Sequence, residues 1–363
     1  MKKRVAVWGT GNVGRPAIRA VLAHKGLELC AVIVSNPNKV GKDAGEIAGV
    51  EPAGVLATDD WQGLIAGKVA GKIDALVYAA SADTRAEEAF VEMLSCIGAG
   101  INVVSPAFYP LLYPQSQNTV KEAVDATQAV CEQGKASVFV SGVDPGWAMD
   151  ILPIMLSGVV SDIQEIRMQE IFNYALYDAP DVVRDVIGFG QPMENKPSML
   201  EESALKTVWS PMVEMVAKEL GYELDSIDVV VEKRALENDV SVATMGEFKK
   251  GTQGAFRFEV RGVSNGHAGI VLEHITRIHS DCAPDWPRPA EGEGCHQVII
   301  KGNPELVVSL HGHDPVEPGP AGGGNCTAAN RLVNAIPAVC DAAPGIVSAI
   351  DLPAIHGGMQ MRG

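Results

Sequence analysis

The chain has 363 residues, of which 47% are hydrophobic and 20% charged, so it has the composition of a folded globular protein and the length of two domains. A formal net charge of −16 excludes electrostatic attraction to nucleic acid or to an anionic membrane surface. No apolar run is long enough to cross a bilayer, the start lacks the pattern of a signal peptide, and the seven cysteines form no Cys-x-x-Cys pair. We therefore expect a cytoplasmic protein with reduced thiols.

The first elements form a strand, helix, strand unit. Residues 4–8 are a short apolar run that ends in glycines, as a buried parallel strand does. Residues 15–25 carry apolar side chains at helical spacing, and residues 29–34 form a second β-branched run. The alternation continues with strands at 75–79, 101–104 and 136–140, a helix capped by Asp83 that stops at Gly98, and a helix at 120–132. This alternation predicts a parallel sheet.

From about residue 160 the pattern changes to longer strands, expected at residues 163–177, 240–248, 255–263, 269–279, 297–301 and 306–310. A helical stretch lies at 204–220, residues 281–296 and 312–325 are Pro- and Gly-rich as loops are, and helical spacing returns at 327–340. These patterns predict an α/β fold with a parallel sheet in residues 1–150 and a second, α+β domain in residues 151–325 with a mostly antiparallel sheet. A C-terminal helix at 326–345 is expected to pack back on the first domain.

A glycine motif lies between the first expected strand and helix. Residues 9–14 read Gly-Thr-Gly-Asn-Val-Gly, in which Gly9 permits a tight turn, Gly11 lets the backbone approach a pyrophosphate, and Gly14 lets the helix pack close to the strand. The helix N-terminus would then hold the phosphates through its N–H groups and its dipole. The motif predicts a Rossmann dinucleotide-binding domain; the alternative is a glycine-rich turn without a ligand.

The form of the coenzyme depends on the residues after the second strand. Where an acidic side chain would hold the ribose 2′-hydroxyl of NAD, the chain offers Ser35, Asn36 and Lys39. Hydrogen-bond donors and a positive charge favour NADP, with NAD possible, unless Lys39 is only a solvated loop residue. The remaining expected coenzyme contacts come from the glycine loop and from strand ends: Thr10, Asn12, Val13, Ala80, Ser81, Ser105 and Asn334.

Several segments together carry a family resemblance: Val-Trp-Gly-Thr-Gly-Asn-Val-Gly at the start, residues 39–46, Asn-Val-Val-Ser at 102–105, Gly-Val-Asp-Pro-Gly-Trp at 142–147, and Asn-Ala-Ile-Pro at 334–337. Through most of its length the chain resembles the dihydrodipicolinate-reductase-like oxidoreductases, and most the branch of 2,4-diaminopentanoate dehydrogenase and amine dehydrogenase. The resemblance implies a homodimer and hydride transfer between nicotinamide and a C=N or C=O carbon.

The chain departs from this branch at one position. Amine dehydrogenases of the branch carry a glutamate just after the strand that matches residues 101–104, whereas residues 105–114 here contain no carboxylate. Tyr109, with an ordinary pKa of about 10, suits proton donation to a developing alkoxide better than deprotonation of ammonium. Asp144 is the alternative acid, unless it only caps its own Asp-Pro-Gly turn.

Four aromatic residues are the candidates for the substrate pocket, each with packing as the alternative: Phe108, Tyr113, Trp147 and Tyr174. Asp178 follows the same strand as Tyr174 and is a weaker candidate. No metal site is expected, because neither His311-Gly-His313-Asp314 nor Cys295-His296 has the spacing of known sites. Residues 262–266 match Gly-x-Ser-x-Gly, but Asn265-Gly266 between two strand patterns predicts a hairpin turn.

The sequence thus predicts an NAD(P)H-dependent reductase or dehydrogenase that acts on a small, rather apolar carbonyl or imine compound, with Tyr109 and Asp144 at the reacting carbon. One alternative is a true amine dehydrogenase that uses a base other than the family glutamate. A second alternative is a non-catalytic protein that binds NADP as a sensor.

Overall fold

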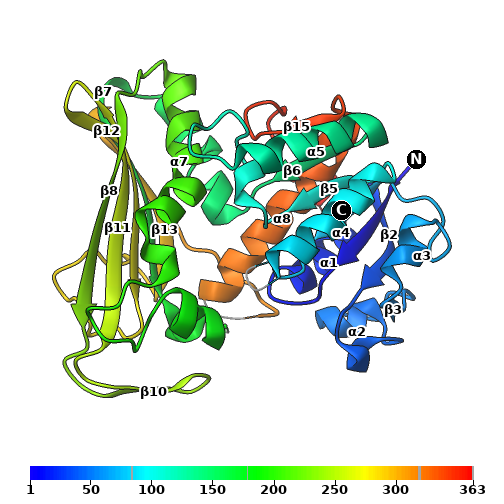
Figure 1. The fold of residues 1–363 in the computed structure, drawn as a ribbon, viewed down its shortest axis with the longest axis horizontal. Coiled ribbons are helices and arrows are strands. Elements are labelled where there is room, and N and C mark those ends of the chain that lie inside the picture. Colours follow the sequence, from blue (N-terminus) through cyan, green and yellow to red (C-terminus); the bar gives the residue numbers. More distant parts are fainter. Residues whose placement is uncertain (83–84, 178, 318–319, 362–363) are drawn as a thin grey trace. The chain divides into compact units, whose positions relative to one another are not determined.

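A computed structural model describes residues 1–82, 85–177, 179–317 and 320–361 (Figure 1). The expected helix cap Asp83 and the candidate Asp178 lie outside these residues. The chain forms two compact units, of which the first comprises Met1–Gln115, Thr119–Trp147 and Asn325–Gly363, and the second Ser116–Asn118 and Ala148–Gly324. Among the described residues, no helix combines the length and the apolar character that a bilayer span requires.

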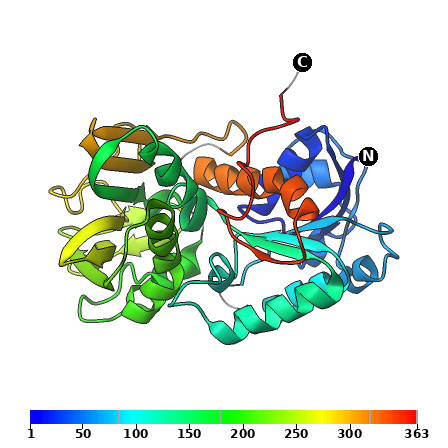
Figure 2. The same cartoon turned by 90° about the horizontal axis from the view of Figure 1, so that it is seen from above.

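The first unit contains a seven-stranded parallel sheet in the order β15-β6-β5-β4-β1-β2-β3. Its strands are β1 (Lys3–Trp8), β2 (Leu27–Ile33), β3 (Ala57–Thr58), β4 (Ala75–Tyr78), β5 (Asn102–Ser105), β6 (Ser137–Val140) and β15 (Gly345–Val347). The strands β4, β5 and β6 are almost entirely buried, since α5 lies on one side of the sheet and α8 on the other (Figure 2). The apolar runs of the sequence are therefore the core of a doubly wound sheet.

The helices of this unit are α1 (Gly14–Ala23), α2 (Ala44–Ala48), α3 (Trp61–Ile65), α4 (Ala86–Gly98) and α5 (Lys121–Gly134), with the 3-10 turns η1 (Pro37–Lys39) and η2 (Tyr109–Leu111). The strand order reverses at β1, because β2 is added to the sheet on one side of β1 and β4 on the other side. In such sheets ligands bind at the carboxyl ends of the two strands that flank the reversal. The loops after β1 and β4 therefore define the expected coenzyme site.

The second unit contains a six-stranded sheet in the order β14-β13-β7-β12-β11-β8. Among its described strands, β7 and β12 pair in parallel, and the other neighbours pair antiparallel. Its strands are β7 (Ser161–Asn173), β8 (Ser226–Ala235), β11 (Gln253–Ser264), β12 (His267–Arg277), β13 (Gly294–Asn303) and β14 (Leu306–Leu310). Asn265 and Gly266 have φ angles of 51° and 76° and join β11 to β12, which confirms the predicted hairpin in place of a nucleophile elbow.

The two faces of this sheet differ in character. One face packs against helix α7 (Glu202–Leu220), where the rings of Trp209 and Phe258 lie 4.8 Å apart. The opposite face carries an ionic network in which Arg167 Nη1 lies 2.7 Å from carboxylate oxygens of both Glu259 and Glu273. The shorter elements of the unit are α6 (Ile151–Ser157), the turns η4 (Tyr174–Leu176), η5 (Val182–Val186) and η6 (Ser198–Leu200), and the hairpin of β9 (Val240–Val242) and β10 (Gly246–Phe248).

Several expectations were wrong: β13 begins at Gly294, inside the loop predicted at 281–296, and β8 was not predicted. The single strand predicted at 240–248 is two short strands around a turn, and the strand predicted at 163–177 ends at Asn173, where η4 begins. The loop predicted at 312–325 contains the start of α8 (Pro320–Asp341). Its glycines argued against a helix, but a Cβ on Gly323 would lie 2.1 Å from the carbonyl oxygen of Gly312, so close backbone packing requires glycine in this first turn.

Candidate functional site

The glycine loop after β1 has two glycines that the fold requires and one that leaves room. Gly9 has a φ of 102°, and a Cβ placed there would lie 2.5 Å from the carbonyl oxygen of Ala79. A Cβ on Gly14 would lie 2.1 Å from the carbonyl oxygen of Gly9. Leaving aside its two chain neighbours, no atom of the described residues comes within 4 Å of a Cβ placed on Gly11. The space beside Gly11 is open, as close approach of a pyrophosphate requires.

The start of α1 suits an anion. Val13 is the N-cap residue, and its side chain is unable to accept a hydrogen bond from the first backbone N–H groups. The first turn, Gly-Arg-Pro-Ala, contains no acidic residue. The helix dipole and the backbone N–H groups therefore present positive potential beside Gly11, which fits the phosphates of a dinucleotide.

Positive side chains gather at the same loop. Lys39 Nζ donates hydrogen bonds to the carbonyl oxygen (3.1 Å) and to the hydroxyl (3.0 Å) of Thr10. Burial lowers the pKa of Lys39, and the neighbouring charges of Arg15 and Lys42 lower it further. Sequence reasoning missed Arg15 and Lys42, although Arg15 follows the last glycine of the motif directly. Lys39 and Arg15 beside the glycine loop, with Lys42 near Lys39, suit an additional phosphate group.

The other predicted coenzyme contacts differ in their exposure and in their distance from the glycine loop. Ser35, Asn36 and Ser81 are exposed, and Asn36 caps η1 by accepting a hydrogen bond from Asn38 N. The backbone N of Ala80 lies 2.7 Å from a Cβ placed on Gly9, so Ala80 adjoins the glycine loop.

Ser105 and Asn334 are engaged elsewhere in the first unit. Ser105 is fully buried; its hydroxyl donates to Tyr78 O (2.8 Å) and accepts from Ala107 N (3.1 Å). Asn334 Oδ1 accepts a hydrogen bond of 3.1 Å from the side chain of Gln360. Both side chains therefore have a structural use of their own.

An aromatic row runs from the end of β1 to the segment after β5. Trp8 contacts Tyr78, Tyr78 contacts Phe108, and Phe108 contacts Phe90, at ring distances of 5.3, 5.7 and 5.9 Å. Phe108 has a φ of 67° and precedes η2, which begins at Tyr109. The predicted pocket residues Phe108 and Tyr109 are thus partly exposed at a strand end.

Tyr113 and the loop after β6 complete the predicted residues of the first unit. Tyr113 is 5% exposed, so most of its surface lies in the interior. Asp144 and Trp147 belong to the irregular turn Val143–Trp147, which is closed by a hydrogen bond from Trp147 N to Gly142 O (3.0 Å) and in which Gly146 has a φ of 140°. The partly buried Asp144 follows the C-terminal end of β6, where side chains of parallel sheets meet ligands.

The second unit holds a row of ionisable side chains that sequence reasoning found only in part. Glu170, His274 and His296 lie opposite one another on the neighbouring strands β7, β12 and β13. His274 Nδ1 lies 3.5 Å from Glu170 Oε1, and His296 Nε2 lies 3.3 Å from Glu170 Oε2. The predicted Tyr174 donates a hydrogen bond of 3.0 Å from its hydroxyl to Glu170 Oε1. We call these four residues the Glu170 row.

The row keeps a buried carboxylate ionised. Glu170, His274 and His296 are 8%, 4% and 6% exposed. Burial alone would raise the pKa of Glu170, but the charges of His274 and His296 and the hydrogen bonds from His296 and Tyr174 outweigh this and lower it. No local motif announces the row, because Glu170, His274 and His296 come from three different strands and Tyr174 comes from η4.

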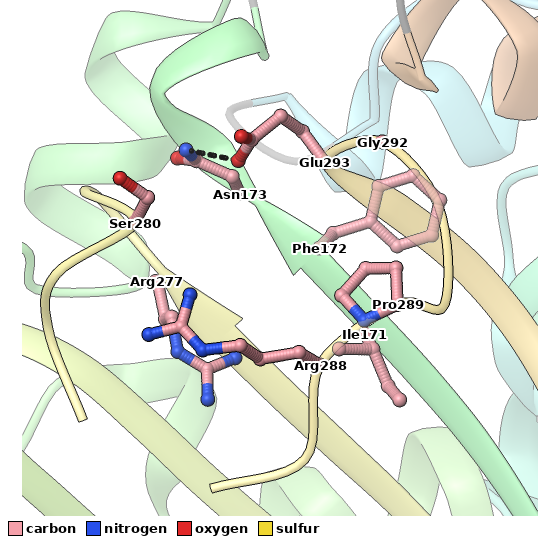
Figure 3. A pocket seen from close by; sticks show the side chains of 9 residues that line it. All are labelled: Ile171, Phe172, Asn173, Arg277, Ser280, Arg288, Pro289, Gly292 and Glu293. Carbon is pink, nitrogen blue, oxygen red and sulfur yellow. Dashed lines mark hydrogen bonds between the residues drawn. The ribbon is translucent and has the colours of Figure 1, made fainter. Parts of the chain in front are cut away.

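A pocket of about 90 Å³ lies nearby in the second unit, and its lining includes Asn173, Arg277 and Arg288 (Figure 3). Arg277 donates to the carbonyl oxygens of Cys282, Ala283 and Trp286, and therefore holds the loop that contains them. The pocket is far smaller than the ~300–1,000 Å³ of small-molecule sites. We therefore do not place the reaction there.

Comparison with known proteins agrees with this geometry. Residues 3–93 match the family model "Dihydrodipicolinate reductase, N-terminus", and residues 147–362 match "2,4-diaminopentanoate dehydrogenase C-terminal domain". The chain is 50% identical to an amine dehydrogenase of Streptomyces virginiae over 96% of this chain and 95% of that protein. It is 25% identical to the 2,4-diaminopentanoate dehydrogenase of Acetoanaerobium sticklandii over 97% of this chain and 94% of the other.

A solved structure shows the same fold. The amine dehydrogenase of Mycobacterium smegmatis is 22% identical and matches with a TM-score of 0.76 over 99% of each chain. The Rossmann sheet, the glycine loop and these relatives define the protein as an NAD(P)-dependent dehydrogenase that uses a nicotinamide coenzyme. Within that class the chain belongs to the 2,4-diaminopentanoate dehydrogenase and amine dehydrogenase family, which confirms the resemblance found in the sequence.

Proposed function

We propose that the protein is an NADP-preferring amine dehydrogenase, which interconverts a small primary amine with the corresponding ketone and ammonia through an imine. The observation that carries this proposal is the 50% identity, over 96% of the chain, with an amine dehydrogenase. It favours the C=N carbon over the C=O carbon, between which the sequence left the choice open. A cytoplasmic homodimer is part of the proposal.

The residues that would hold the coenzyme are in the first unit. The loop Gly9–Gly14 and the start of α1 fit the pyrophosphate, and Ala80 adjoins this loop. Lys39, with Arg15 and Lys42, would pair with the 2′-phosphate that distinguishes NADP, and Ser35 and Asn36 are exposed beside it at the end of β2. When bound, the nicotinamide supplies hydride transfer to and from the carbon that carries the nitrogen.

The residues that would meet the substrate include Tyr109 and Asp144, as hydrogen-bonding or proton-exchanging groups at strand ends. Phe108, Tyr113 and Trp147 would form apolar walls, which suits an amine with a hydrocarbon body. The proposed substrate class is therefore a small, mainly apolar primary amine.

The test is NADPH oxidation by the purified protein with a panel of aliphatic and cyclic ketones, with and without ammonium chloride at alkaline pH. Turnover that requires ammonium, and NADP reduction by the matching amines, would support the proposal. Turnover that is independent of ammonium, together with oxidation of the matching alcohols, would establish a ketone reductase instead, the function that residues 105–114 favour by their lack of a carboxylate. Coenzyme binding without any turnover would support a sensor.

A further inference from the structure

We propose that the pocket of the second unit binds a small oxyanion, a short carboxylate or inorganic phosphate, between the guanidinium groups of Arg277 and Arg288. The pocket lies between the ends of β7 and β12 and the loop of residues 278–293, so all of its lining belongs to the second unit. The inference therefore goes beyond the proposed function and does not depend on it. We call this site the Arg277 pocket.

The first argument is how arginines are paired on one face of the sheet. On the face opposite α7, Arg167 and Arg257 both pair with Glu273, at 2.7 and 2.5 Å. Arg277 lies further along β12 than Glu273, and because side chains alternate along a strand, it lies on the same face. No carboxylate of a described residue pairs with Arg277. This end of the face therefore holds an arginine without the counter-charge that the other two have.

The guanidinium group of Arg277 is buried and only partly satisfied. The residue is 4% exposed, and its Nε and Nη2 donate hydrogen bonds to the carbonyl oxygens of Cys282, Ala283 and Trp286. Its Nη1 has no hydrogen-bond partner among the residues that the structure describes. A buried charge without a counter-ion is costly, and an unused N–H donor on a residue that lines a cavity is able to bind a ligand there.

A second guanidinium group lies beside the first. Arg288 lines the same pocket, and Figure 3 shows its guanidinium group next to that of Arg277. Burial lowers the pKa of Arg277, and the positive charge of Arg288 lowers it further, which the negative charge of Asp285 offsets only in part. Within the described chain, Arg288 forms no hydrogen bond or ion pair. An anion between the two groups would replace their repulsion by two attractive contacts.

The size and the lining of the pocket define the class of ligand. A volume of about 90 Å³ has room for a few waters or for one small ion. Ser280 adds a hydroxyl, and Ile171 and Pro289 add apolar surface. Glu293 also lines the pocket, but it accepts a hydrogen bond of 2.9 Å from Asn173, and Figure 3 shows it away from the guanidinium groups. The arginine end of the pocket therefore suits a small oxyanion.

Binding would connect two parts of the second unit. Arg277 is the last residue of β12, whereas Arg288 belongs to the loop that leads to β13. An anion held by both side chains would tie this loop to the sheet, in addition to the carbonyl groups that Arg277 already holds. Because a ligand that binds only the ordered loop stabilises it, we expect the backbone amides of residues 278–293 to exchange more slowly when the anion is bound.

The test is calorimetric titration of the full-length protein with sodium phosphate and, separately, with sodium propionate, at constant ionic strength. We expect saturable binding with a dissociation constant on the order of 1 mM, a value open to a ligand of about five heavy atoms. Arg288→Met, at an exposed residue, should weaken binding at least about tenfold, because a charge-assisted contact is lost. The matched control is Lys196→Met, which removes an exposed charge of the same unit outside the pocket and should keep the affinity within about twofold.

A second control separates the Arg277 pocket from the glycine loop, where phosphate is also expected to bind. Lys39→Ala should leave the affinity of the pocket within about twofold of wild type. Hydrogen exchange followed by mass spectrometry should slow in residues 278–293 of wild type on adding the anion, and should not slow in Arg288→Met. The anion that binds more tightly, phosphate or propionate, identifies the source of the oxyanion.

Three results would overturn the inference. These are the absence of saturable binding of both anions, equal affinities in wild type and Arg288→Met, and binding that is lost in Lys39→Ala but kept in Arg288→Met, which would assign the anion to the glycine loop. None of the three bears on the proposed function, since they concern binding in the second unit and involve neither turnover nor the coenzyme.

Discussion

Lys39 Nζ donates hydrogen bonds to both the carbonyl oxygen and the hydroxyl of Thr10, at 3.1 and 3.0 Å. These contacts tie η1, which follows β2, to the glycine loop that follows β1. A positive charge is thereby held at the edge of the loop, where we propose that NADP carries its 2′-phosphate.

Replacing Lys39 by alanine should weaken NADPH binding by about tenfold to thirtyfold, or roughly 1.4–2 kcal/mol, because a charge-assisted contact to the 2′-phosphate is lost. NADH binding should change by less than about threefold. Calorimetric titration of both coenzymes measures the two constants, and Lys68→Ala, at an exposed lysine of the same unit, is the control. Equal losses for both coenzymes would mean that Lys39 only supports the loop.

Gly11→Ala should impair coenzyme binding, whereas Gly14→Ala should impair the stability of the fold. A Cβ at Gly11 meets open space in the described chain, so the melting temperature without coenzyme should be unchanged, while coenzyme affinity falls at least about tenfold because the backbone is no longer approachable. A Cβ at Gly14 would lie 2.1 Å from Gly9 O, so this variant should lose about 1–3 kcal/mol of stability or more. Thermal melts with and without NADPH separate the two effects; a Gly11→Ala protein with full affinity would contradict the assigned pyrophosphate position.

Tyr109→Phe and Asp144→Asn test the two residues that the sequence placed at the reacting carbon. If a residue exchanges a proton with the substrate, its variant should lower kcat by about 10²-fold or more with little change in coenzyme affinity. Steady-state kinetics with the best substrate give the answer. A variant with wild-type kcat and KM would show that the corresponding side chain has only a packing or turn-forming role.

Arg167→Met should destabilise the protein by about 1.5–3 kcal/mol at pH 7, because Glu259 and Glu273 each lose one of their buried charged partners and keep Arg257. Burial alone would raise the pKa of Glu259, but Arg167 and Arg261 outweigh this and lower it. In the wild type this carboxylate therefore contributes stability above its ordinary pKa of 4.5, and the contribution disappears as the pH falls through its lowered value.

In Arg167→Met, Glu259 and Glu273 keep Arg257 but lose one counter-charge, so they should take up protons more readily. The loss in free energy of unfolding relative to wild type should therefore be smaller at pH 5 than at pH 7, as measured by urea unfolding at both pH values. Lys249→Met removes the exposed pairs with Asp239 and Glu247 and should change nothing measurable. A deficit that is the same at both pH values would contradict the role assigned to Arg167.

The coenzyme loop was predictable because its physical requirement is local. Gly9, Gly11 and Gly14 are contiguous with the strand and the helix that they join, so spacing alone states which backbone positions must lack a Cβ. The Glu170 row was not predictable in this way, since Glu170 and His296 are 126 residues apart and meet only through the register of β7 and β13. Of that row, Tyr174 alone was found, from its position at a strand end.

The start of α8 is a second feature that the sequence did not predict, for a different reason. Three consecutive glycines have a low helix propensity, and the sequence therefore predicted a loop. The close backbone approach between Gly323 and Gly312 outweighs that preference, and it involves residues that no local pattern connects. Helix propensity predicts a segment whose conformation depends on its own sequence. It fails where contact with a distant segment determines the conformation.

Trp8 occupies the last position of β1, directly before Gly9, with Trp61 5.4 Å and Tyr78 5.3 Å from its ring. The chain therefore carries a natural chromophore at the edge of its own glycine loop. Reduced nicotinamide absorbs where indole emits, so quenching of tryptophan fluorescence should follow loading of the first unit without any label. Comparison with Trp8→Phe would isolate this signal from the remaining four tryptophans.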